Sequence, residues 1–455
     1  MQQFDLIVIG GGPAGYLAGE RAGAAGLRVA VFEERALGGV CLNEGCIPTK
    51  TLLNSAKLYD HARHSEAYGI TSDGARLDHK AVIARKDRVV AKLVAGVQAK
   101  LKRNKVTVIN ARATITGRDE TGFLVEADRE QYNAGKILLA TGSGPIIPGI
   151  PGVREGLASG FVMTSREILD LTEVPERLVI IGGGVIGLEM ASYFNVAGAK
   201  VTVVEMLDHV GGALDPELSA GLRKAYEKQG MEFRLGCKVT AVEKNGVRVA
   251  AADGEQIVEA DKVLLCIGRR ASIDGLGLEN IGVLVERGAV VTDENMRTNV
   301  SGVYAAGDVN GKSMLAHTAY REAEVAVNHM LGKRDRMRYH AIPSVIYTNP
   351  EVASVGETGE SATKKGLLVK TVKLPMIYSG RYLAEVEDGD GFCKLVVDTA
   401  YDCLLGVQLM GSYASEMIFG AGLMIETEMK IDDIKELVFP HPTVSEIIRE
   451  TLFEI

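Results

Sequence analysis

The sequence predicts an α/β fold with two Rossmann-like dinucleotide-binding domains. Residues 6–9 and 178–181 read as short apolar strands, and each leads into a glycine-rich loop that opens a helix. The next strand of each copy ends on an acid, Glu33 or Glu205, 23 residues after the first glycine of the loop. A lone G-x-G-x-x-G match is weak, but this shared register favours two copies of one fold over two unrelated glycine turns.

The loop glycines permit a tight turn and let a pyrophosphate rest on the helix N-terminus. A carboxylate at the end of the following strand accepts hydrogen bonds from ribose hydroxyls and repels a 2′-phosphate. Glu205 therefore favours NAD over NADP, and the next three residues, 206–208, supply no arginine for a phosphate. The glycines concerned are Gly10, Gly12 and Gly15 in the first copy and Gly182, Gly184 and Gly187 in the second.

Cys41 and Cys46 are separated by four residues. Two thiols at this spacing can close a small disulfide when the spacer curls into the first turn of a helix. Pro48 and the helix-forming residues after it predict that Cys46 lies at a helix N-terminus. The partial positive charge there lowers a thiol pKa from its reference of about 8.5, and Lys50 falls on the same helix face. We interpret the pair as redox-active.

A stabilising disulfide and a metal pair are the alternatives for these two cysteines. The first is disfavoured because a strand begins almost at Met1 and leaves no room for a secretory signal. The second would need further cysteine or histidine nearby, so no metal is expected. Two dinucleotides and one dithiol imply an electron relay. One dinucleotide should be a flavin, because a nicotinamide cannot readily accept electrons from a thiolate.

Composition indicates a soluble protein of about three domains. The chain has 455 residues, of which 46% are hydrophobic, and a formal net charge of −8. This charge disfavours a nucleic-acid partner, and no apolar run approaches the roughly 18 residues that a membrane span needs. We expect a reducing, cytoplasmic location, where a cysteine pair is more often catalytic than structural.

Taken together, the motifs resemble the pyridine nucleotide-disulfide oxidoreductases over essentially the whole chain. The resemblance implies FAD and NAD as cofactors, and a C-terminal α+β dimerisation domain through which two copies form a homodimer. Besides the first loop and the cysteine run, the matching segments are residues 140–143, 182–189, 266–270, 306–308, 314–317 and 441–446.

The resemblance also implies how the cofactors are held. The first loop with Glu33, Asp308 and the backbone at Ala316 would hold FAD, and the second loop with Glu205 and Gly268 would hold NAD. Gly142, in the segment 140–143, completes the set of cofactor-site residues. Without the family, an ordinary turn explains an aspartate at position 308 equally well.

The family further implies the residues that handle electrons and protons. Lys50 resembles the lysine beside the reactive nitrogen of the flavin, paired with Glu189. By itself, Glu189 would be an acid in the first turn of a helix. His441 would take a thiol proton while Glu446 orients its far nitrogen, at the disulfide of the other subunit. An ordinary His-Pro turn followed by a surface glutamate is the alternative.

Several subfamilies fit this chain less well. Glutathione and trypanothione reductases prefer NADPH, which Glu205 opposes. Mercuric reductases carry a cysteine pair at the C-terminus, where residues 451–455 contain no thiol, and soluble transhydrogenases lack the first cysteine pair. The remaining reaction is oxidation of protein-bound dihydrolipoamide, in which the substrate attacks Cys41 and Cys46 is left as a thiolate facing the flavin.

Two other functions stay open from the sequence. An NADH-dependent reductase of another small disulfide would share every motif. A catalytically silent scaffold would bind nucleotides but would need neither the cysteines nor His441. For the favoured function, the expected partner is a lipoylated protein of a 2-oxo acid or acetoin dehydrogenase complex, or the glycine-cleavage carrier.

The predicted domains follow the motifs. They are an FAD-binding domain at residues 1–145, an NAD-binding domain at 146–268, a central segment at 269–336 that completes the FAD site, and a dimerisation domain at 337–455.

Overall fold

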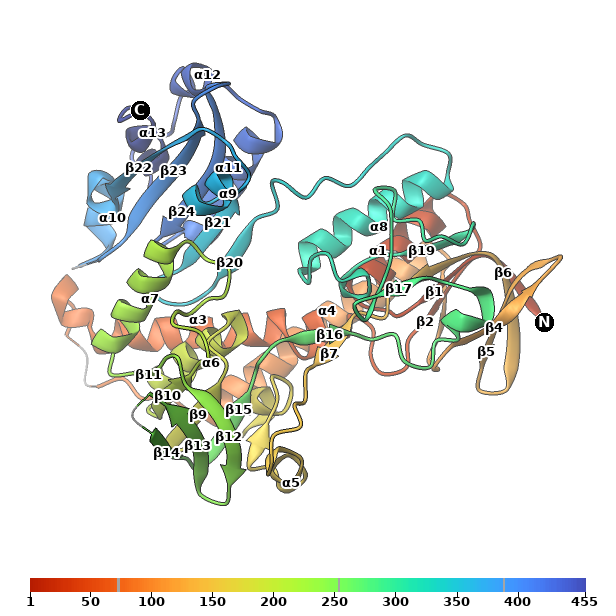
Figure 1. Ribbon diagram of the computed structural model, residues 1–455, viewed down its shortest axis with the longest axis horizontal. Coiled ribbons are helices and arrows are strands. Elements are labelled where there is room, and N and C mark those ends of the chain that lie inside the picture. Colours follow the sequence, from red (N-terminus) through yellow and green to blue (C-terminus); the bar gives the residue numbers. More distant parts are fainter. Residues whose placement is uncertain (72–73, 253, 388) are drawn as a thin grey trace. The chain divides into compact units, whose positions relative to one another are not determined.

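The computed structural model describes residues 1–71, 74–252, 254–387 and 389–455. The chain separates into two compact units, each built from three stretches. Unit 1 comprises Met1–Thr51, Ile83–Ile146 and Gly268–Arg338, and unit 2 comprises Leu52–Val82, Ile147–Ile267 and Tyr339–Ile455. Both units combine strands and helices, which confirms the predicted α/β class (Figure 1).

Unit 1 contains the first predicted nucleotide fold. The helices α3 (Cys46–Arg63) and α4 (His79–Arg103) pass from one unit to the other. The other elements are β1 (Gln2–Ile9), α1 (Pro13–Ala24), β2 (Val29–Phe32), α2 (Gly39–Asn43), β3 (Thr107–Ile109), β4 (Thr114–Asp119), β5 (Gly122–Ala127), β6 (Glu130–Leu139), β7 (Ser143–Pro145), β16 (Arg269–Ala271), η3 (Leu278–Ile281), β17 (Val285–Glu286), β18 (Ala289–Val290), β19 (Val303–Ala305), η4 (Asp308–Asn310) and α8 (Ala316–Met330).

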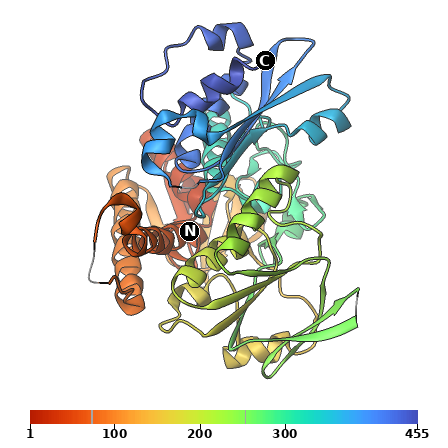
Figure 2. The ribbon, with the colours of Figure 1, turned by 90° about the vertical axis from the view of Figure 1, so that its left-hand side faces the viewer.

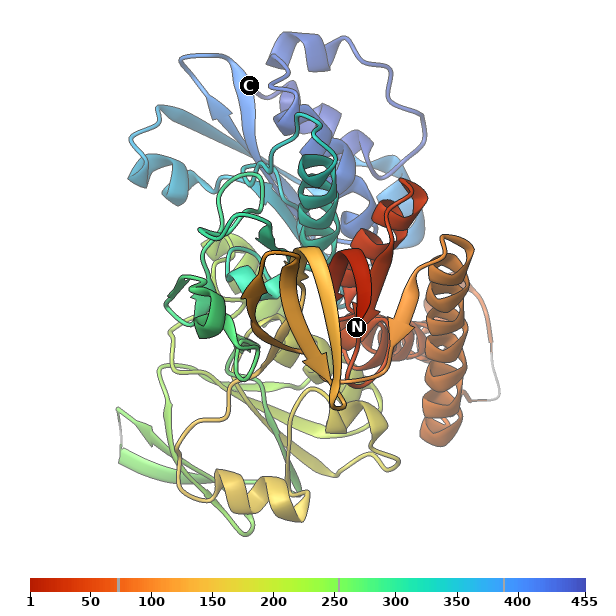
Figure 3. The ribbon, with the colours of Figure 1, turned by 90° about the vertical axis from the view of Figure 1, so that its right-hand side faces the viewer.

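A seven-stranded sheet forms the core of unit 1. Its order is β3-β2-β1-β6-β5-β4, with β19 also paired to β6. Strands β1, β2, β3, β6 and β19 run parallel, β5 runs antiparallel to β6, and β4 runs antiparallel to β5. Figure 1 shows α1 and α8 side by side, and Figure 3 shows the long helix α4 beside the sheet. Apolar residues at alternate positions, such as Ile7 and Ile9, pack into the core with Ile137 and Leu139.

Unit 2 contains the second predicted nucleotide fold and the C-terminal residues. Its elements are η1 (Ser65–Tyr68), α5 (Val153–Ser159), β8 (Val162–Met163), η2 (Glu167–Asp170), β9 (Arg177–Ile181), α6 (Val185–Val196), β10 (Lys200–Val204), α7 (Pro216–Lys228), β11 (Glu232–Arg234), β12 (Lys238–Glu243), β13 (Gly246–Ala251), β14 (Gly254–Glu259), β15 (Lys262–Leu265), β20 (Ser344–Ile346), β21 (Val352–Gly356), α9 (Gly359–Lys364), β22 (Val369–Pro375), η5 (Met376–Tyr378), α10 (Gly380–Glu385), β23 (Phe392–Asp398), β24 (Cys403–Met410), α11 (Ala414–Glu426), α12 (Ile431–Lys435) and α13 (Glu446–Leu452).

Two five-stranded sheets organise unit 2. The first has the order β11-β10-β9-β15-β8 and is parallel, as a Rossmann-like fold requires. The second, β20-β21-β24-β23-β22, is antiparallel. Figure 2 shows this second sheet in blue with helices along it. Met417 and Ile418 of α11 and Ile447 and Ile448 of α13 pack with its strands in one core cluster.

The segment 52–82 belongs to unit 2, although the prediction placed it in the FAD-binding domain. Its polar contacts explain the difference: the ring of buried His79 is 2.7 Å from the Tyr193 hydroxyl, and Asn349 donates to Asp60. The divisions between units fall within two residues of predicted boundaries at 145, 268 and 336. The four-domain division itself stays a prediction. None of the helices in the described ranges combines the length and apolar character that a membrane span needs.

A buried charge cluster joins α7 to the second sheet within unit 2. Asp215 is almost completely buried, caps the N-terminus of α7 through the Glu217 N–H at 2.9 Å, and lies 2.9 Å from the ammonium of Lys394. Burial lowers the Lys394 pKa, but the hydrogen bonds that its ammonium donates to Glu217 and Asp215 outweigh burial, so the pKa is raised. The lysine therefore stays charged where it is only slightly exposed.

We expect Asp215→Ala to lower the stability of unit 2 by about 2 kcal/mol, because it removes a helix cap and one partner of a buried ammonium. Thermal unfolding of the FAD-loaded protein measures the change. Asp208→Ala, which alters an exposed acid of the same unit, is the matched control and should leave the midpoint nearly unchanged. Equal effects of the two substitutions would contradict the role given to Asp215.

Candidate active site

The first glycine-rich loop turns sharply between β1 and α1. Gly10 has φ +105°, and a Cβ there would lie 2.3 Å from the carbonyl oxygen of Ala140. A Cβ on Gly15 would lie 1.8 Å from the oxygen of Gly10. No other residue type fits either position, because the backbone itself fills the space. The tight turn predicted from the sequence is confirmed.

The second loop repeats this geometry in unit 2. Gly182 has φ +108°, and its added Cβ would lie 2.4 Å from the carbonyl oxygen of Cys266. A Cβ on Gly187 would lie 2.2 Å from the oxygen of Gly182. The two loops therefore match in conformation and in close contacts, which supports their interpretation as two copies of one fold.

The middle glycines leave open space at the helix N-termini. Gly12 and Gly184 are the N-caps of α1 and α6, with extended backbone. A Cβ on Gly184 would meet no described atom within 4 Å, and one on Gly12 would meet only Gly39, at 3.8 Å. Backbone N–H groups and the positive end of the helix dipole face this space, so a pyrophosphate fits it.

The two predicted acids hold the glycine loops in the same way. The Glu33 carboxylate accepts from the Gly11 N–H at 2.8 Å, and the Glu205 carboxylate accepts from the Gly183 N–H at 2.7 Å. Leu207 N–H donates to the second oxygen of Glu205 at 2.9 Å. Both carboxylates thus lie beside the loop, where the ribose of a dinucleotide would need them.

Asp308 lies just after β19 and begins the short helix η4. The Ser143 hydroxyl donates to its carboxylate, and Arg269 donates to the Ser143 hydroxyl at 2.8 Å. Of the other expected cofactor residues, Gly142 and Gly268 have positive φ, and Ala316 is the first residue of α8, where N–H groups lack partners within the helix.

Sequence reasoning missed Glu322, which fixes the Asp308 loop. This carboxylate is completely buried on α8. It accepts from the Gly307 N–H at 2.6 Å and from the Asn310 side chain at 2.9 Å. The available signal was a glutamate whose neighbours on the same helix face, Ala319, Val325 and Ala326, are apolar, because a buried carboxylate must find donors.

The two cysteines lie on consecutive helices of unit 1. Cys41 lies on the short helix α2, and Cys46 is the first residue of α3, as predicted. The Gly38 N–H donates to the Gly11 oxygen at 2.9 Å, which ties α2 to the nucleotide loop. The pKa of Cys41 is raised well above its ordinary value, chiefly by its hydrogen bond with Cys46 and then by burial, while Lys50 opposes the shift.

Two tyrosines that the sequence did not single out lie near this pair. The hydroxyl groups of Tyr16 on α1 and Tyr320 on α8 contact each other, and their rings meet edge to face at 5.9 Å. Burial raises both pKa values, and the charges of Cys41 and Cys46 raise them further. Both phenols therefore remain protonated donors within electrostatic range of the thiols.

Lys50 and Glu189 lie in different units, so their pairing stays a prediction. Glu189 is buried on α6, one residue past the first turn in which the sequence placed it. It accepts from the Tyr347 N–H at 3.0 Å.

His441 and Glu446 lie in contact in unit 2. The imidazole Nδ1 of His441 is 2.8 Å from one carboxylate oxygen of Glu446, and the Thr443 N–H donates to the other oxygen at 2.8 Å. The bond from Thr443, followed by that from His441, holds the pKa of Glu446 below its usual range. The His441 side chain is 79% exposed, so its Nε2 edge can be reached by another molecule.

Two models of one protein family match most of this chain. A family model for pyridine nucleotide-disulphide oxidoreductases matches residues 4–323, and the model for the dimerisation domain of that family matches residues 342–452. The chain belongs to this family.

Individual relatives cover nearly the whole chain. Dihydrolipoyl dehydrogenase of Chlamydia muridarum is 39% identical over 99% of this chain and 96% of its own length. Dihydrolipoyl dehydrogenase of Thermus scotoductus is 41% identical over 99% of this chain and 97% of its own length. The crystal structure of LpdA from Mycobacterium tuberculosis has a TM-score of 0.89 at 26% identity, and covers 100% of this chain and 99% of that one.

Membership of the oxidoreductase family confirms the enzyme class and cofactors predicted from the sequence. The chain is an FAD-dependent, NAD-linked oxidoreductase that acts on a sulfur group. The open helix N-termini at Gly12 and Gly184 fit the two dinucleotides, one in each unit. The match to the dimerisation domain indicates a homodimer.

We expect Gly184→Ala to raise the KM for NAD roughly tenfold or more, because its Cβ would enter space that a pyrophosphate needs. The unfolding midpoint should change little, since no described atom lies within 4 Å of that Cβ. Gly96→Ala on α4 has the same free space and serves as the control in steady-state kinetics. An unchanged KM for NAD in Gly184→Ala would contradict the site.

Proposed function

We propose that this chain oxidises protein-bound dihydrolipoamide to lipoamide and reduces NAD to NADH, with Cys41 and Cys46 as the redox pair. The sequence-based prediction of this reaction is confirmed by the relatives named dihydrolipoyl dehydrogenase, which align with nearly the whole chain. For the residues themselves, the supporting observation is the contact between Cys41 and Cys46 beside the glycine loop of unit 1.

The proposed dithiol exchange uses the two substrate thiols, the two cysteines and His441 as the base. His441 takes a proton from one substrate thiol, and the resulting thiolate attacks Cys41 of the oxidised pair, releasing Cys46 as a thiolate. The second substrate sulfur then displaces Cys41 and closes the lipoamide ring, so that two electrons reside on the reduced pair. When bound, FAD supplies an acceptor for these electrons and NAD takes them up as hydride.

The assignment of Cys46 as the charged sulfur rests on electrostatics. Two adjacent thiols titrate as a pair, and ionisation of one opposes ionisation of the other. Cys46 has the helix N-terminus, whereas the pKa of Cys41 is raised by its bond with Cys46 and by burial. The first thiolate therefore forms on Cys46. Tyr16 and Tyr320 supply protonated hydroxyls near this charge.

The proposed base is held ready by its carboxylate. Glu446 accepts from Nδ1 of His441, which leaves Nε2 to take the thiol proton and stabilises the charged ring that results. Because the pKa of Glu446 lies below its usual range, the carboxylate keeps its charge in mildly acidic solution.

The proposed partner is a lipoylated protein, either the acyltransferase component of a 2-oxo acid or acetoin dehydrogenase complex or the glycine-cleavage carrier. We place the reaction in the cytoplasm. A reducing compartment suits a cysteine pair that cycles between thiol and disulfide during catalysis.

A steady-state assay with free dihydrolipoamide tests the reaction. We expect NADH formation with NAD and little reaction with NADP, because the Glu205 carboxylate beside the second glycine loop would repel a 2′-phosphate. The competing function, reduction of another small disulfide, is assayed in reverse with NADH and a panel of disulfides. A disulfide turned over faster than lipoamide would replace the proposed substrate.

We expect Cys46→Ser to abolish the long-wavelength absorbance that a thiolate beside an oxidised flavin produces, whereas Cys41→Ser should retain it. The measurement is the visible spectrum of each FAD-loaded variant, compared with that of the two-electron-reduced parent. The opposite result would exchange the roles of the two cysteines.

We expect mixed dimers to recover activity when a Cys41→Ser chain is coexpressed with a His441→Gln chain. The family's use of a histidine from the other subunit motivates this expectation. Half of the dimers would be mixed and each would hold one complete site, giving about a quarter of parental activity. If each chain completes its own site, every site lacks one group and the mixture stays inactive.

A further inference from the structure

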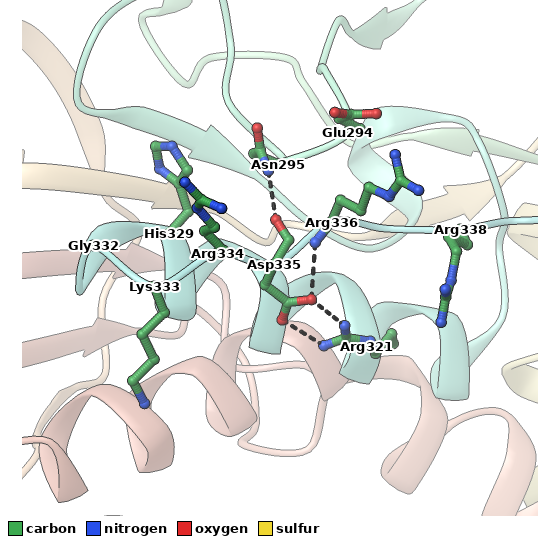
Figure 4. Close-up of a pocket in the computed structure, with 10 residues that line it drawn as sticks. All are labelled: Glu294, Asn295, Arg321, His329, Gly332, Lys333, Arg334, Asp335, Arg336 and Arg338. Carbon is green, nitrogen blue, oxygen red and sulfur yellow. Dashed lines mark hydrogen bonds and ion pairs between the residues drawn. The ribbon is translucent and has the colours of Figure 1, made fainter.

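A pocket of about 600 Å³ in unit 1 shares no residue with the candidate active site. It lies at the end of α8 and along the segment that follows (Figure 4). Four arginines line it, Arg321, Arg334, Arg336 and Arg338. Its volume falls within the range of small-ligand sites, but its lining is mainly charged rather than apolar.

The segment after α8 is fixed by hydrogen bonds from its backbone. The Lys333 N–H donates to the Asn328 oxygen at 2.9 Å, and the Met337 N–H donates to the Glu294 oxygen at 2.8 Å. Met337 is buried, whereas Arg336 and Arg338 on either side of it are exposed. The backbone of this segment is therefore anchored, and the arginine side chains on either side of Met337 reach solvent.

Asp335 pairs with Arg321 and not with the side chains of Arg334 and Arg336, which flank it in the sequence. The Asp335 carboxylate accepts from both terminal nitrogens of Arg321, from the Asn328 side chain at 2.8 Å and from the Arg336 N–H at 2.8 Å. The bonds from Arg321 hold the pKa of Asp335 below its usual range. Asp335 and Arg321 therefore balance each other and form the floor of the pocket.

Basic side chains outnumber acidic ones around this floor, where Glu294 is the second lining acid besides Asp335. Figure 4 shows Arg334 beside His329 on one side of Asp335, and Arg336 and Arg338 on the other. Within the described ranges, no side-chain hydrogen bond or ion pair is found for Arg334 or Arg336. Like charges that line one pocket repel one another, and a bound anion would relieve that repulsion.

We propose that this pocket binds a small anion that carries two or more phosphoryl groups. The planar guanidinium group presents paired donors that match phosphate oxygens, and Arg334 and Arg336 both keep their donors available. The concave floor limits the ligand to a small molecule. The net charge of −8 on the whole chain repels long polyanions, so recognition depends on the local cluster.

Calorimetric titration with inorganic tripolyphosphate tests the proposal. The protein is FAD-loaded and saturated with NAD, so that both dinucleotide sites are already filled. We expect binding of one tripolyphosphate per chain that weakens as salt is raised. The variant Arg334→Gln/Arg336→Gln should weaken it roughly tenfold or more, since each substitution removes charged donors.

The matched control is Arg85→Gln/Arg88→Gln, which removes the same charge from exposed positions of α4. Its affinity for tripolyphosphate should equal that of the parent. The thermal midpoint of each variant verifies folding. Equal weakening in both double variants, or no binding to the parent, would overturn the proposal. Tighter binding of hexaglutamate than of tripolyphosphate would also overturn it, in favour of an acidic peptide.

Discussion

In both nucleotide folds, the first glycine of the loop lies against the carbonyl that directly follows a neighbouring strand, and this close approach positions the site. Gly10 touches the carbonyl of Ala140, and Gly182 touches that of Cys266, at distances that exclude any side chain. In unit 1 the strands β1, β2, β6 and β19 are parallel, so their carboxyl ends meet at one edge. The first glycine loop, Glu33 and the Asp308 loop all follow these ends. The tight turn at Gly10 therefore helps to place the candidate cofactor site at this edge of the sheet.

Carboxylates that accept backbone N–H groups fix most of the functional loops. A charged acceptor makes a stronger hydrogen bond than a neutral one, and a buried carboxylate is costly without such donors. In each case, the charged acid holds the loop in place, and the N–H group of the loop stabilises the charge of the acid. The carboxylates and their backbone donors are Glu33 with Gly11, Glu205 with Gly183, Glu322 with Gly307, Glu189 with Tyr347, Glu446 with Thr443 and Asp335 with Arg336.

The sequence was sufficient where the determinants are local. Strand, glycine loop, helix and acid follow one another within 28 residues in each copy, which is why both nucleotide folds could be predicted. The helix start at Cys46 could be predicted from the residues directly after it. Contacts between residues far apart in the sequence could not be predicted. Nothing near residue 79 indicates that His79 meets Tyr193, or that Tyr16 meets Tyr320 across 304 residues. The proximity of Arg321 to Asp335 likewise needs the turn after α8.

The three-part composition of unit 1 has a consequence for biosynthesis. Its sheet needs β19, and its candidate flavin residues Asp308 and Ala316 come from the last of its three stretches, which ends at Arg338. A ribosome must therefore translate the whole parallel sheet of unit 2 before unit 1 can close. Until then, the end of β6 that pairs with β19, Ile137–Leu139, has an open edge and is exposed to wrong pairing. Flavin capture consequently belongs to the late stage of translation or to the released chain.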